Sequence, residues 1–459
     1  MDAVNTSEKK GRAVGTTENG WCRAVPGGTG ITVLAVHFSH PIPTVTTLQK
    51  AIHKVQLSQT ILRARITNTS SNPNHRSFFL DISPTPTVEI KSFSGSDVLT
   101  GLPDRSSSII YALVEHEMNL NPWEGQDFSN PVDVLFANLY EVDDGSVLVI
   151  RAHTAVSDRT SGGTIVKKLV DAMANDGDGD DDGDGNMLLP LEDLVPPELK
   201  KKALWARGIG MVGYSMNFLR SSILPFEDAK ATRVSRIAKL DLGLEETQKL
   251  VSVCNEKGIK LCGVLTAAGL IAAVKSKKIP NSKSETHTIV TLSDCRKRLI
   301  NPLCNNDIGF YHSAIQNLYT VNGQEDIWEL SVKCYSTYLN ARNKNKDLQD
   351  MADLNFLMVK AIENPGMTHS SSLRTALLSV FDEPEIYTSS EFLHHEGVDD
   401  YIGCSSTHGV GTSIAIFDTI KDGKLCCTCM FPSPLHSREM VQGIIDEMKK
   451  LIVDGIPAM

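Results

Sequence analysis

The sequence predicts a mixed α/β protein built from two similar lobes. Its 459 residues exceed what one ordinary hydrophobic core organises, so two domains of roughly 200 residues each are expected. Strand-like and helix-like segments occur together in both halves of the chain, and a low-complexity acidic stretch separates the halves. We therefore place a first lobe at residues 1–174, a linker and crossover at 175–233, and a second lobe at 234–459.

Apolar periodicity defines the elements of the first lobe, which follow a polar amino-terminal tail. The expected elements, in order, are a buried strand at 30–40, a helix that runs into a short extended end at 44–66, strands at 75–82 and 87–93, a short helix at 108–120, and a hairpin at 133–156. The hairpin turns at Asp144-Gly145, a dipeptide that favours a tight turn. A helix follows at 161–173, with the Ser161 hydroxyl as its expected N-cap.

The acidic stretch NDGDGDDDGDGN, residues 175–186, superficially matches a calcium-binding loop. Counted from Asp178, however, the twelfth position is Leu189 instead of the bidentate glutamate that such loops need. The stretch holds too little apolar surface to offset its chain entropy, so we expect a disordered, solvated linker. The crossover that follows it contains a helix near residues 201–219.

The second lobe repeats the mixture of strands and helices. The expected elements, in order, are a strand at 236–243, a helix at 244–258 that ends at a glycine, an apolar helix at 262–277, a strand that runs into a charged turn at 286–299, strands at 373–381, 412–420 and 424–431, and an amphipathic helix at 437–455.

Composition excludes several classes of partner. The net charge of −10 disfavours nucleic acid, because phosphate binding needs a basic face. The ten cysteines lack zinc-site spacing, so we expect free thiols and no metal site. The amino terminus has no secretory apolar core, and no apolar run reaches the ~18 residues that span a bilayer. We therefore expect a cytoplasmic monomer that does not bind membranes.

The segment RAHTAVSDRTSGG, residues 151–163, carries the candidate chemistry, at the end of the hairpin's second strand. Histidine suits acid–base work, because its ordinary pKa of about 6.5 lets it accept and return a proton near neutral pH. His153 and Asp158 are five positions apart in this segment.

Four stretches and their order resemble the plant HxxxD-type acyltransferases, which are grouped with chloramphenicol acetyltransferase and the condensation domains of peptide synthetases. The stretches are residues 48–66, 152–158, 244–274 and 293–315. The resemblance implies two chloramphenicol-acetyltransferase-like lobes with a channel between them. It also implies acyl transfer from a thioester to a hydroxyl or amine of a small specialised metabolite, with acyl-coenzyme A as the expected co-substrate and no other cofactor.

In this family the motif aspartate lies four residues after the catalytic histidine and pairs with an arginine of the second lobe. By resemblance, these structural residues are Asp158 and Arg296. The family histidine takes a proton from the acceptor, which then attacks the thioester carbonyl.

The extra residue in the motif leaves two alignments open. Without a gap, Thr154 occupies the catalytic position and His153 faces away from the channel, because successive strand residues point to opposite sides. A threonine hydroxyl is not basic enough to replace an imidazole. With a one-residue gap, a bulge at Ala155 turns His153 into the channel as the base. We name His153 as the catalytic residue, since it is the only imidazole of the motif.

Four further residues are candidates for substrate binding: Thr154, Arg159, His312 and His408. Arg159 replaces the glycine that usually follows the motif aspartate, which adds charge and bulk to the channel floor. His312 and His408 are alternative bases if Thr154 occupies the catalytic position.

The resemblance weakens at the DFGWG element of the plant branch. It should lie near residues 377–386, where only Phe381 and Asp382 match. Two other classes of function therefore stay open. The scaffold could orient reactants for a different condensation or cyclisation, or the channel could bind a ligand without catalysis.

Overall fold

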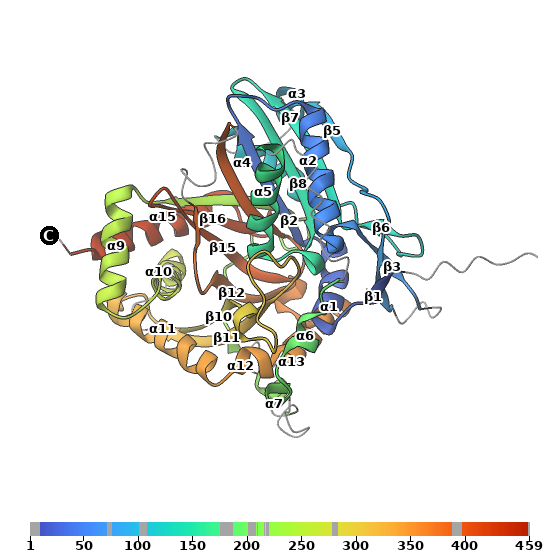
Figure 1. The fold of residues 1–459 in the computed structure, drawn as a ribbon. Coiled ribbons are helices and arrows are strands. Elements are labelled where there is room, and N and C mark those ends of the chain that lie inside the picture. The colour runs from blue at the N-terminus through green and yellow to red at the C-terminus, as the bar shows by residue number, and fades with distance from the viewer. Residues whose placement is uncertain are drawn as a thin grey trace, which may run out of the picture.

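A computed structural model describes residues 10–457 except 71–75, 101–107, 175–186, 201–207, 209, 215, 217–219, 278–282 and 388–396. The acidic stretch at 175–186 and most of the helix expected at 201–219 lie outside the described residues. The chain folds into two lobes that lie side by side (Figure 1), and each is built from helices and β-sheet. The predicted fold class, an α/β protein of two lobes with mixed sheets, is confirmed.

A five-stranded sheet with the order β14-β2-β8-β7-β5 forms the centre of the first lobe. Its strands are β2 (Thr29–Phe38), β5 (Ile90–Ser94), β7 (Leu135–Val142), β8 (Gly145–His153) and β14 (Val398–Thr407). The helices of this lobe are α1 (Thr16–Ala24), α2 (Val45–Ser58), α3 (Gly95–Thr100), α4 (Ile109–Met118) and α5 (Arg159–Ala174). A smaller sheet holds β1 (Gly11–Ala13), β3 (Ala64–Asn68), β4 (Phe78–Ile82) and β6 (Val132–Asp133).

One strand of the first lobe's sheet comes from the second half of the sequence. β14 runs antiparallel to β2, with Ile402 opposite Ala35, and completes the sheet on that side. The expected strands did not include it, because Asp399 and Asp400 interrupt its apolar pattern. The sheet of the first lobe is therefore not made by one continuous stretch of chain.

The second lobe contains a larger mixed sheet with the order β11-β10-β12-β15-β16-β9, and β13 lies beside β15. Its strands are β9 (Val234–Asp241), β10 (Glu285–Asp294), β11 (His312–Val321), β12 (Arg374–Phe381), β13 (Glu385–Tyr387), β15 (Gly411–Lys421) and β16 (Lys424–Ser433). β12 is parallel to both of its neighbours, while β11, β16 and β9 join by antiparallel pairing.

Helices cover this sheet and connect it to the first lobe. They are α6 (Leu191–Leu194), α7 (Pro197–Lys200), α9 (Leu244–Glu256), α10 (Leu261–Ser276), α11 (Ile327–Asn343), α12 (Lys346–Gln349), α13 (Met351–Glu363) and α15 (Arg438–Gly455). α10 is buried from Leu261 to Val274. A Cβ atom on Gly263 would lie 2.9 Å from the Ser331 carbonyl oxygen of α11, so glycine permits this close helix approach.

Two local expectations were wrong. The amino-terminal tail contains a helix, α1, because Glu18 accepts a hydrogen bond from the Gly15 amide (2.8 Å) and pairs with Arg12 (2.6 Å). Helix α5 begins at Arg159, so Ser161 lies inside it. The carboxylate of Asp158 accepts from the Ser161 amide at 2.8 Å and takes the capping position that we expected for Ser161.

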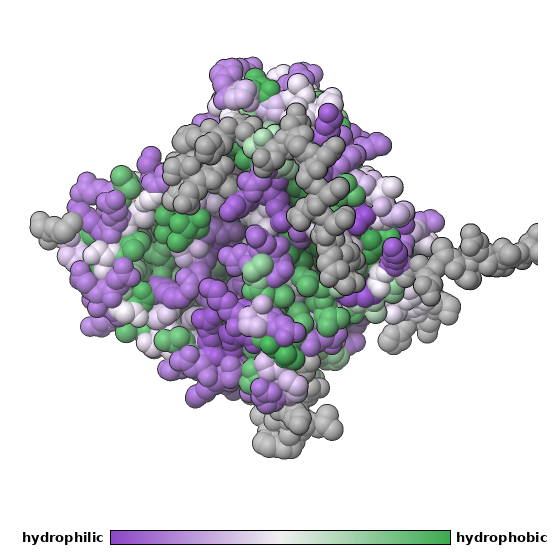
Figure 2. All heavy atoms as spheres, in the orientation of Figure 1, coloured by the Kyte–Doolittle hydropathy of each residue, from purple (hydrophilic) through white to green (hydrophobic). Residues whose placement is uncertain are grey.

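Hydrophilic residues predominate on the face shown in Figure 2, with hydrophobic areas between them. Among the described residues, no single helix is long and apolar enough to cross a membrane. Helices α9 and α10 reach that threshold only when they are counted together, across a bend of 104°.

Three buried histidines and one half-buried histidine are expected to make the folded protein sensitive to acid. Burial lowers their pKa values, to about 3 for His153 and to about 4 for His287, His408 and His436. The unfolded chain takes up these protons below about pH 6.5, so it binds more protons than the folded protein between about pH 6.5 and 4. As the pH is lowered through this window, the free energy of unfolding should therefore decrease, by about 1 kcal/mol per pH unit for each histidine.

Denaturant midpoints at neutral pH and at about pH 5 check this prediction. The raised pKa of His312 acts in the opposite direction and offsets part of the loss. A His436→Gln variant should show a smaller decrease than the unmodified protein, and an unchanged midpoint in the unmodified protein would contradict the prediction.

Candidate active site

A cavity of about 490 Å³ lies between the lobes. Its walls come from α1, β2, β14 and the turn before α5 on one side, and from β10, β11, β12, β15 and α13 on the other. The lining is largely apolar, with serine and threonine hydroxyls set among the carbon atoms. Such a combination suits a small, mostly apolar ligand that a few polar groups orient.

The backbone at the end of β8 distinguishes the two alignments of the motif. β8 keeps a regular register with β2 up to His153, which lies opposite Ile31. One turn of 3-10 helix (Thr154–Val156) then leads to α5. The gapped alignment needs a bulge at Ala155, but the pairing with β2 ends at His153 without a bulge, and Ala155 lies in the 3-10 turn. The backbone therefore agrees with the ungapped alignment, which matches Thr154 to the position that the resemblance gives to the catalytic residue.

His153 is fully buried and is not among the residues that line the cavity. Its Nδ1 atom accepts a hydrogen bond from the Ala155 amide at 3.1 Å, and its ring packs edge-on against Trp123, with centroids 5.0 Å apart. Burial lowers the pKa of His153 to about 3, so the ring is neutral. The catalytic role that we assigned to His153 stays a prediction for kinetics to test, and this geometry gives it no support.

Thr154 lines the cavity, as expected for a substrate-binding residue. Its hydroxyl donates to the Gly30 carbonyl oxygen at 2.5 Å and lies 3.0 Å from the Thr32 hydroxyl. A hydroxyl has a single proton, so Thr154 accepts from Thr32 when it donates to Gly30. Thr154 is thus a fixed part of the wall and has no group that can serve as a base.

Asp158 is held by both lobes. Arg296 contacts it at 2.9 Å through one terminal nitrogen and at 3.0 Å through the other, so the ion pair predicted from the sequence is present. The Tyr311 amide also donates to Asp158, at 2.8 Å. Burial disfavours the carboxylate, but Arg296 and His312 outweigh burial and hold the pKa of Asp158 far below its usual range. Asp158 is therefore ionised at neutral pH.

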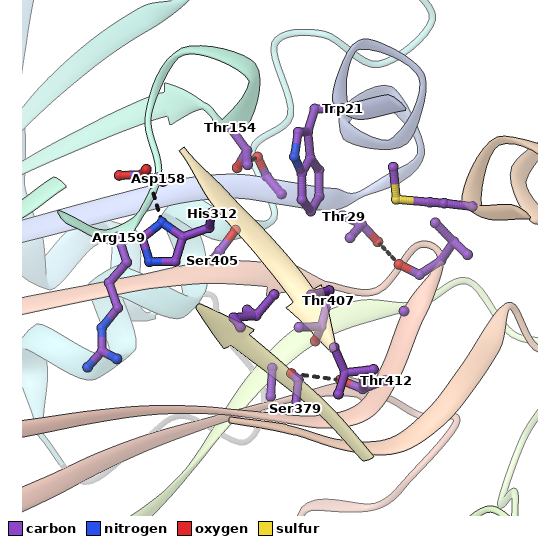
Figure 3. A pocket seen from close by; sticks show the side chains of 18 of the residues that line it. Trp21, Thr29, Thr154, Asp158, Arg159, His312, Ser379, Ser405, Thr407 and Thr412 are labelled. Atoms are coloured by element: carbon purple, nitrogen blue, oxygen red, sulfur yellow. Dashed lines mark hydrogen bonds and ion pairs between the residues drawn. The ribbon is translucent and has the colours of Figure 1, made fainter. Parts of the chain in front are cut away.

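Among the described residues, His312 is the histidine that lines the cavity, and it lies at the start of β11. Its Nδ1 atom lies 3.0 Å from an oxygen of Asp158, and a dashed line joins the two side chains in Figure 3. Burial disfavours the imidazolium, but the carboxylates of Asp158 and Asp294 outweigh burial and raise the pKa of His312 above its ordinary value. A carboxylate-bound imidazole at a cavity wall is suited to proton transfer.

Arg159 lines the cavity and connects the two lobes. Its guanidinium lies 3.1 Å from the Asp418 carboxylate, 3.6 Å from that of Glu385, and 4.2 Å from the centre of the Phe381 ring. Burial raises the pKa of Asp418 to about 6. In Figure 3 the Arg159 side chain extends away from His312. These second-lobe groups hold the guanidinium, and its substrate-binding role stays a prediction.

His408 is not among the residues that line the cavity. Its Nδ1 atom lies 3.0 Å from the Ser235 hydroxyl, and burial lowers its pKa to about 4. A Cβ atom on Gly28 would lie 2.0 Å from the His408 ring, so the ring packs directly on the chain before β2. His408 therefore packs behind the cavity wall and does not contact the space inside it.

Sequence reasoning missed several residues of this site. Trp21 of α1 lines the cavity, although the tail that contains it gave no signal beyond one aromatic residue among polar ones. Thr407 and Ser379 also line the cavity. Their hydroxyls belong to strand patterns in which every second residue faces the same side, and without the sheet order that side was unknown.

The two motif neighbours His153 and Thr154 should respond differently to substitution. His153→Ala removes a fully buried ring, so we expect a loss of about 2–4 kcal/mol in the free energy of unfolding and unchanged turnover per folded molecule. Thr154→Val keeps the side-chain volume, so it should change turnover or substrate choice with little loss of stability. Denaturation curves, and kinetics of variants confirmed to be folded, check both. A His153→Ala enzyme that is stable yet inactive would contradict this assignment.

Comparison with known proteins shows the fold. No protein-family model matches the chain, and no curated protein matches its sequence. Among solved structures, trichothecene 15-O-acetyltransferase from Fusarium sporotrichioides is similar, with a TM-score of 0.72, 11% identity, and coverage of 97% of this chain and 95% of that one. Polyketide synthase associated protein 5 from Mycobacterium tuberculosis has a TM-score of 0.65 and 14% identity, and the match covers 96% of this chain and 98% of that one.

A peptide-synthetase domain has the same architecture. The epimerization domain from the third module of tyrocidine synthetase B has a TM-score of 0.61 and 12% identity, and the match covers 98% of this chain and 96% of that one. The chain therefore has the fold of the superfamily that contains chloramphenicol acetyltransferase and the condensation domains. That fold is shared by acyltransferases and condensation enzymes.

Proposed function

We propose that the protein transfers an acyl group from a thioester, with acyl-coenzyme A as the donor, to a hydroxyl or amine of a small specialised metabolite. One observation carries the proposal. In a fold shared with acyltransferases, His312 lines the inter-lobe cavity and is paired with the ionised Asp158 at 3.0 Å. This pair supplies the proton acceptor that the Thr154 position lacks.

The chemistry assigned to His312 follows from its contacts. Because Asp158 engages Nδ1, Nε2 is the ring nitrogen available to a substrate. Nε2 takes the proton of the acceptor hydroxyl or amine while the acceptor oxygen or nitrogen bonds to the thioester carbonyl carbon. The tetrahedral intermediate then collapses, the carbon–sulfur bond breaks, and the imidazolium returns its proton to the departing thiolate.

Asp158 supports this cycle without exchanging a proton. Its negative charge favours the imidazolium that forms during attack, and Arg296 keeps the carboxylate in place. We thus propose that His312, and not His153, is the base. The proposal also places the protein in the plant HxxxD branch, which the order of its elements and the match at Asp158 and Arg296 support. We propose, in addition, that it is a cytoplasmic monomer.

Binding of the donor tests the proposal directly. A thioester that binds the folded protein raises its melting temperature by mass action. Acetyl-coenzyme A and benzoyl-coenzyme A should therefore stabilise the protein, whereas free pantetheine serves as a weaker-binding control. Mass spectrometry with a panel of phenolic and amine acceptors should then detect acylated product. No thermal shift with either thioester, together with no product, would refute acyl transfer.

Two observations favour a second function, a condensation or cyclisation without a thioester, or ligand binding alone. The Thr154 hydroxyl is already fully hydrogen-bonded, and the DFGWG element is only partly present. Asp382 is buried and accepts hydrogen bonds from Ser293 and Tyr338, both at 2.9 Å, while Phe381 packs edge-on against His312. The same cavity could then perform a condensation or cyclisation of a metabolite without a thioester, or bind a ligand only. Stabilisation by an acceptor but by no thioester would favour this second function.

A further inference from the structure

The indole N–H of Trp21 is a buried donor without a hydrogen-bond partner among the described residues. The described part of the chain offers a direct comparison. The indole N–H of Trp123 donates to the Asp133 carbonyl oxygen at 2.9 Å, and that of Trp328 donates to the Gly455 carbonyl oxygen at 2.6 Å. Buried indole N–H groups in proteins are normally paired in this way. Trp21, which lines the cavity, departs from the rule.

The position of Trp21 places this donor beside the reactive part of the cavity. A Cβ atom on Gly30 would lie 2.9 Å from the Trp21 ring and 3.1 Å from the Thr154 hydroxyl, so the two side chains flank the same glycine. The Trp21 ring centre lies 5.3 Å from that of Phe310, which lies 6.4 Å from that of His312. Figure 3 shows the indole nitrogen on the edge of the ring nearer Thr154 and His312.

A second buried polar group without a hydrogen-bond partner among the described residues, the Thr407 hydroxyl, lines the same cavity. Thr407 is 7% exposed, and Figure 3 shows it with Ser379 and Thr412 nearby. The Ser379 hydroxyl donates to that of Thr412 at 3.2 Å, because Thr412 donates its own proton to the Ile414 carbonyl oxygen at 3.0 Å. The Thr407 hydroxyl has no such acceptor among the described residues.

We propose that Trp21 and Thr407 form a binding site for carbonyl oxygen atoms of the ligand. An indole N–H donates only, so the ligand atom opposite Trp21 must be an acceptor. The surrounding wall is largely apolar, which favours a neutral carbonyl over a charged group. The ligand class is therefore an apolar ketone, ester or lactone of a size that the cavity of about 490 Å³ admits. The inference concerns binding and holds whether or not acyl transfer occurs.

Matched ligands and near-isosteric variants test the site. The probes are the monoketone chalcone and the diketone 1,4-diphenylbutane-1,4-dione, each compared with the hydrocarbon in which methylene groups replace the carbonyls. Trp21→Phe removes the N–H and keeps an aromatic ring on Phe310, while Thr407→Val removes the hydroxyl at equal volume. Trp328→Phe is the control, because it removes an indole N–H that lies outside the cavity lining. Dissociation constants come from NMR titration of protein with ¹⁵N-labelled indoles.

We expect the unmodified protein and Trp328→Phe to bind at least one ketone about tenfold more tightly than its hydrocarbon partner. The preference should fall close to one in Trp21→Phe for the monoketone, and it should decrease in Thr407→Val for the diketone. The indole resonance that disappears in Trp21→Phe should shift downfield with the ketone and not with the hydrocarbon. Absence of any ketone preference in the unmodified protein, including failure of every probe to bind, overturns the proposal, as does a preference that Trp21→Phe retains.

Discussion

Replacing His312 by glutamine should slow acyl transfer by about 10²–10⁴-fold, the range expected for loss of a general base. Glutamine keeps a polar side chain near Asp158 but has no basic nitrogen, so the variant should fold and still bind the acceptor. His408→Gln is a matched control, because it changes a second histidine, one that lies behind the cavity wall. Single-turnover rates of the three proteins with a saturating thioester check the prediction.

The pH dependence gives an independent readout of the same residue. A base must be neutral to accept a proton, and Asp158 raises the pKa of His312 above its ordinary value of 6.5. The rate should therefore rise with pH through that raised pKa and then level off. Loss of this inflection in His312→Gln, with its retention in His408→Gln, assigns it to His312. A His312→Gln enzyme with near-normal rate would remove this residue from the mechanism.

Replacing Arg296 by methionine should lower the free energy of unfolding by roughly 3–5 kcal/mol, because it removes the guanidinium that pairs with the buried Asp158 carboxylate. Arg296 is 1% exposed, and it also contacts Asp294 at 3.0 Å and the Ser161 hydroxyl at 3.0 Å. The substitution should also lower activity, since Asp158 holds His312.

Two control variants distinguish the contribution of the Asp158–Arg296 ion pair from the general effect of removing a charge. Lys249→Ala removes an exposed ion pair with Glu245 and should cost less than about 1 kcal/mol. The double variant with Arg296→Met and Asp158→Asn removes both charges and should regain part of the lost stability. Because the pKa of Asp158 is depressed, the pair contributes fully at neutral pH and is lost only in strong acid. Equal stability of Arg296→Met and the unmodified protein would contradict the prediction.

Local pattern predicted the parts of this molecule that depend on local chemistry. The hairpin of β7 and β8, the helix α4 and the apolar helix α10 follow from periodicity and turn residues. The Asp158–Arg296 pair came from resemblance, because 138 residues separate the partners. The local sequence pattern cannot predict an ion pair between residues so far apart in the chain.

The rest depended on contacts that pattern does not contain. Whether His153 or Thr154 faces the cavity is decided by the register of β8 against β2, and a shift of one residue would exchange them. Helix α1 is held by Arg12 and by packing on α13, which brings Trp21 to the cavity from a segment that reads as a polar tail. The pairing of His312 with Asp158 required the lobes to be placed together.

The origin of β14 has a consequence for the timing of synthesis. β2 ends at Phe38 and β14 begins at Val398, so at about 5–20 residues per second the second strand leaves the ribosome roughly 20–70 s after the first. During that interval the edge of β2 offers unpaired backbone groups to any extended segment that passes. Nascent chains that end before residue 398 should therefore be held by chaperones, and release should coincide with the emergence of β14 from the ribosome.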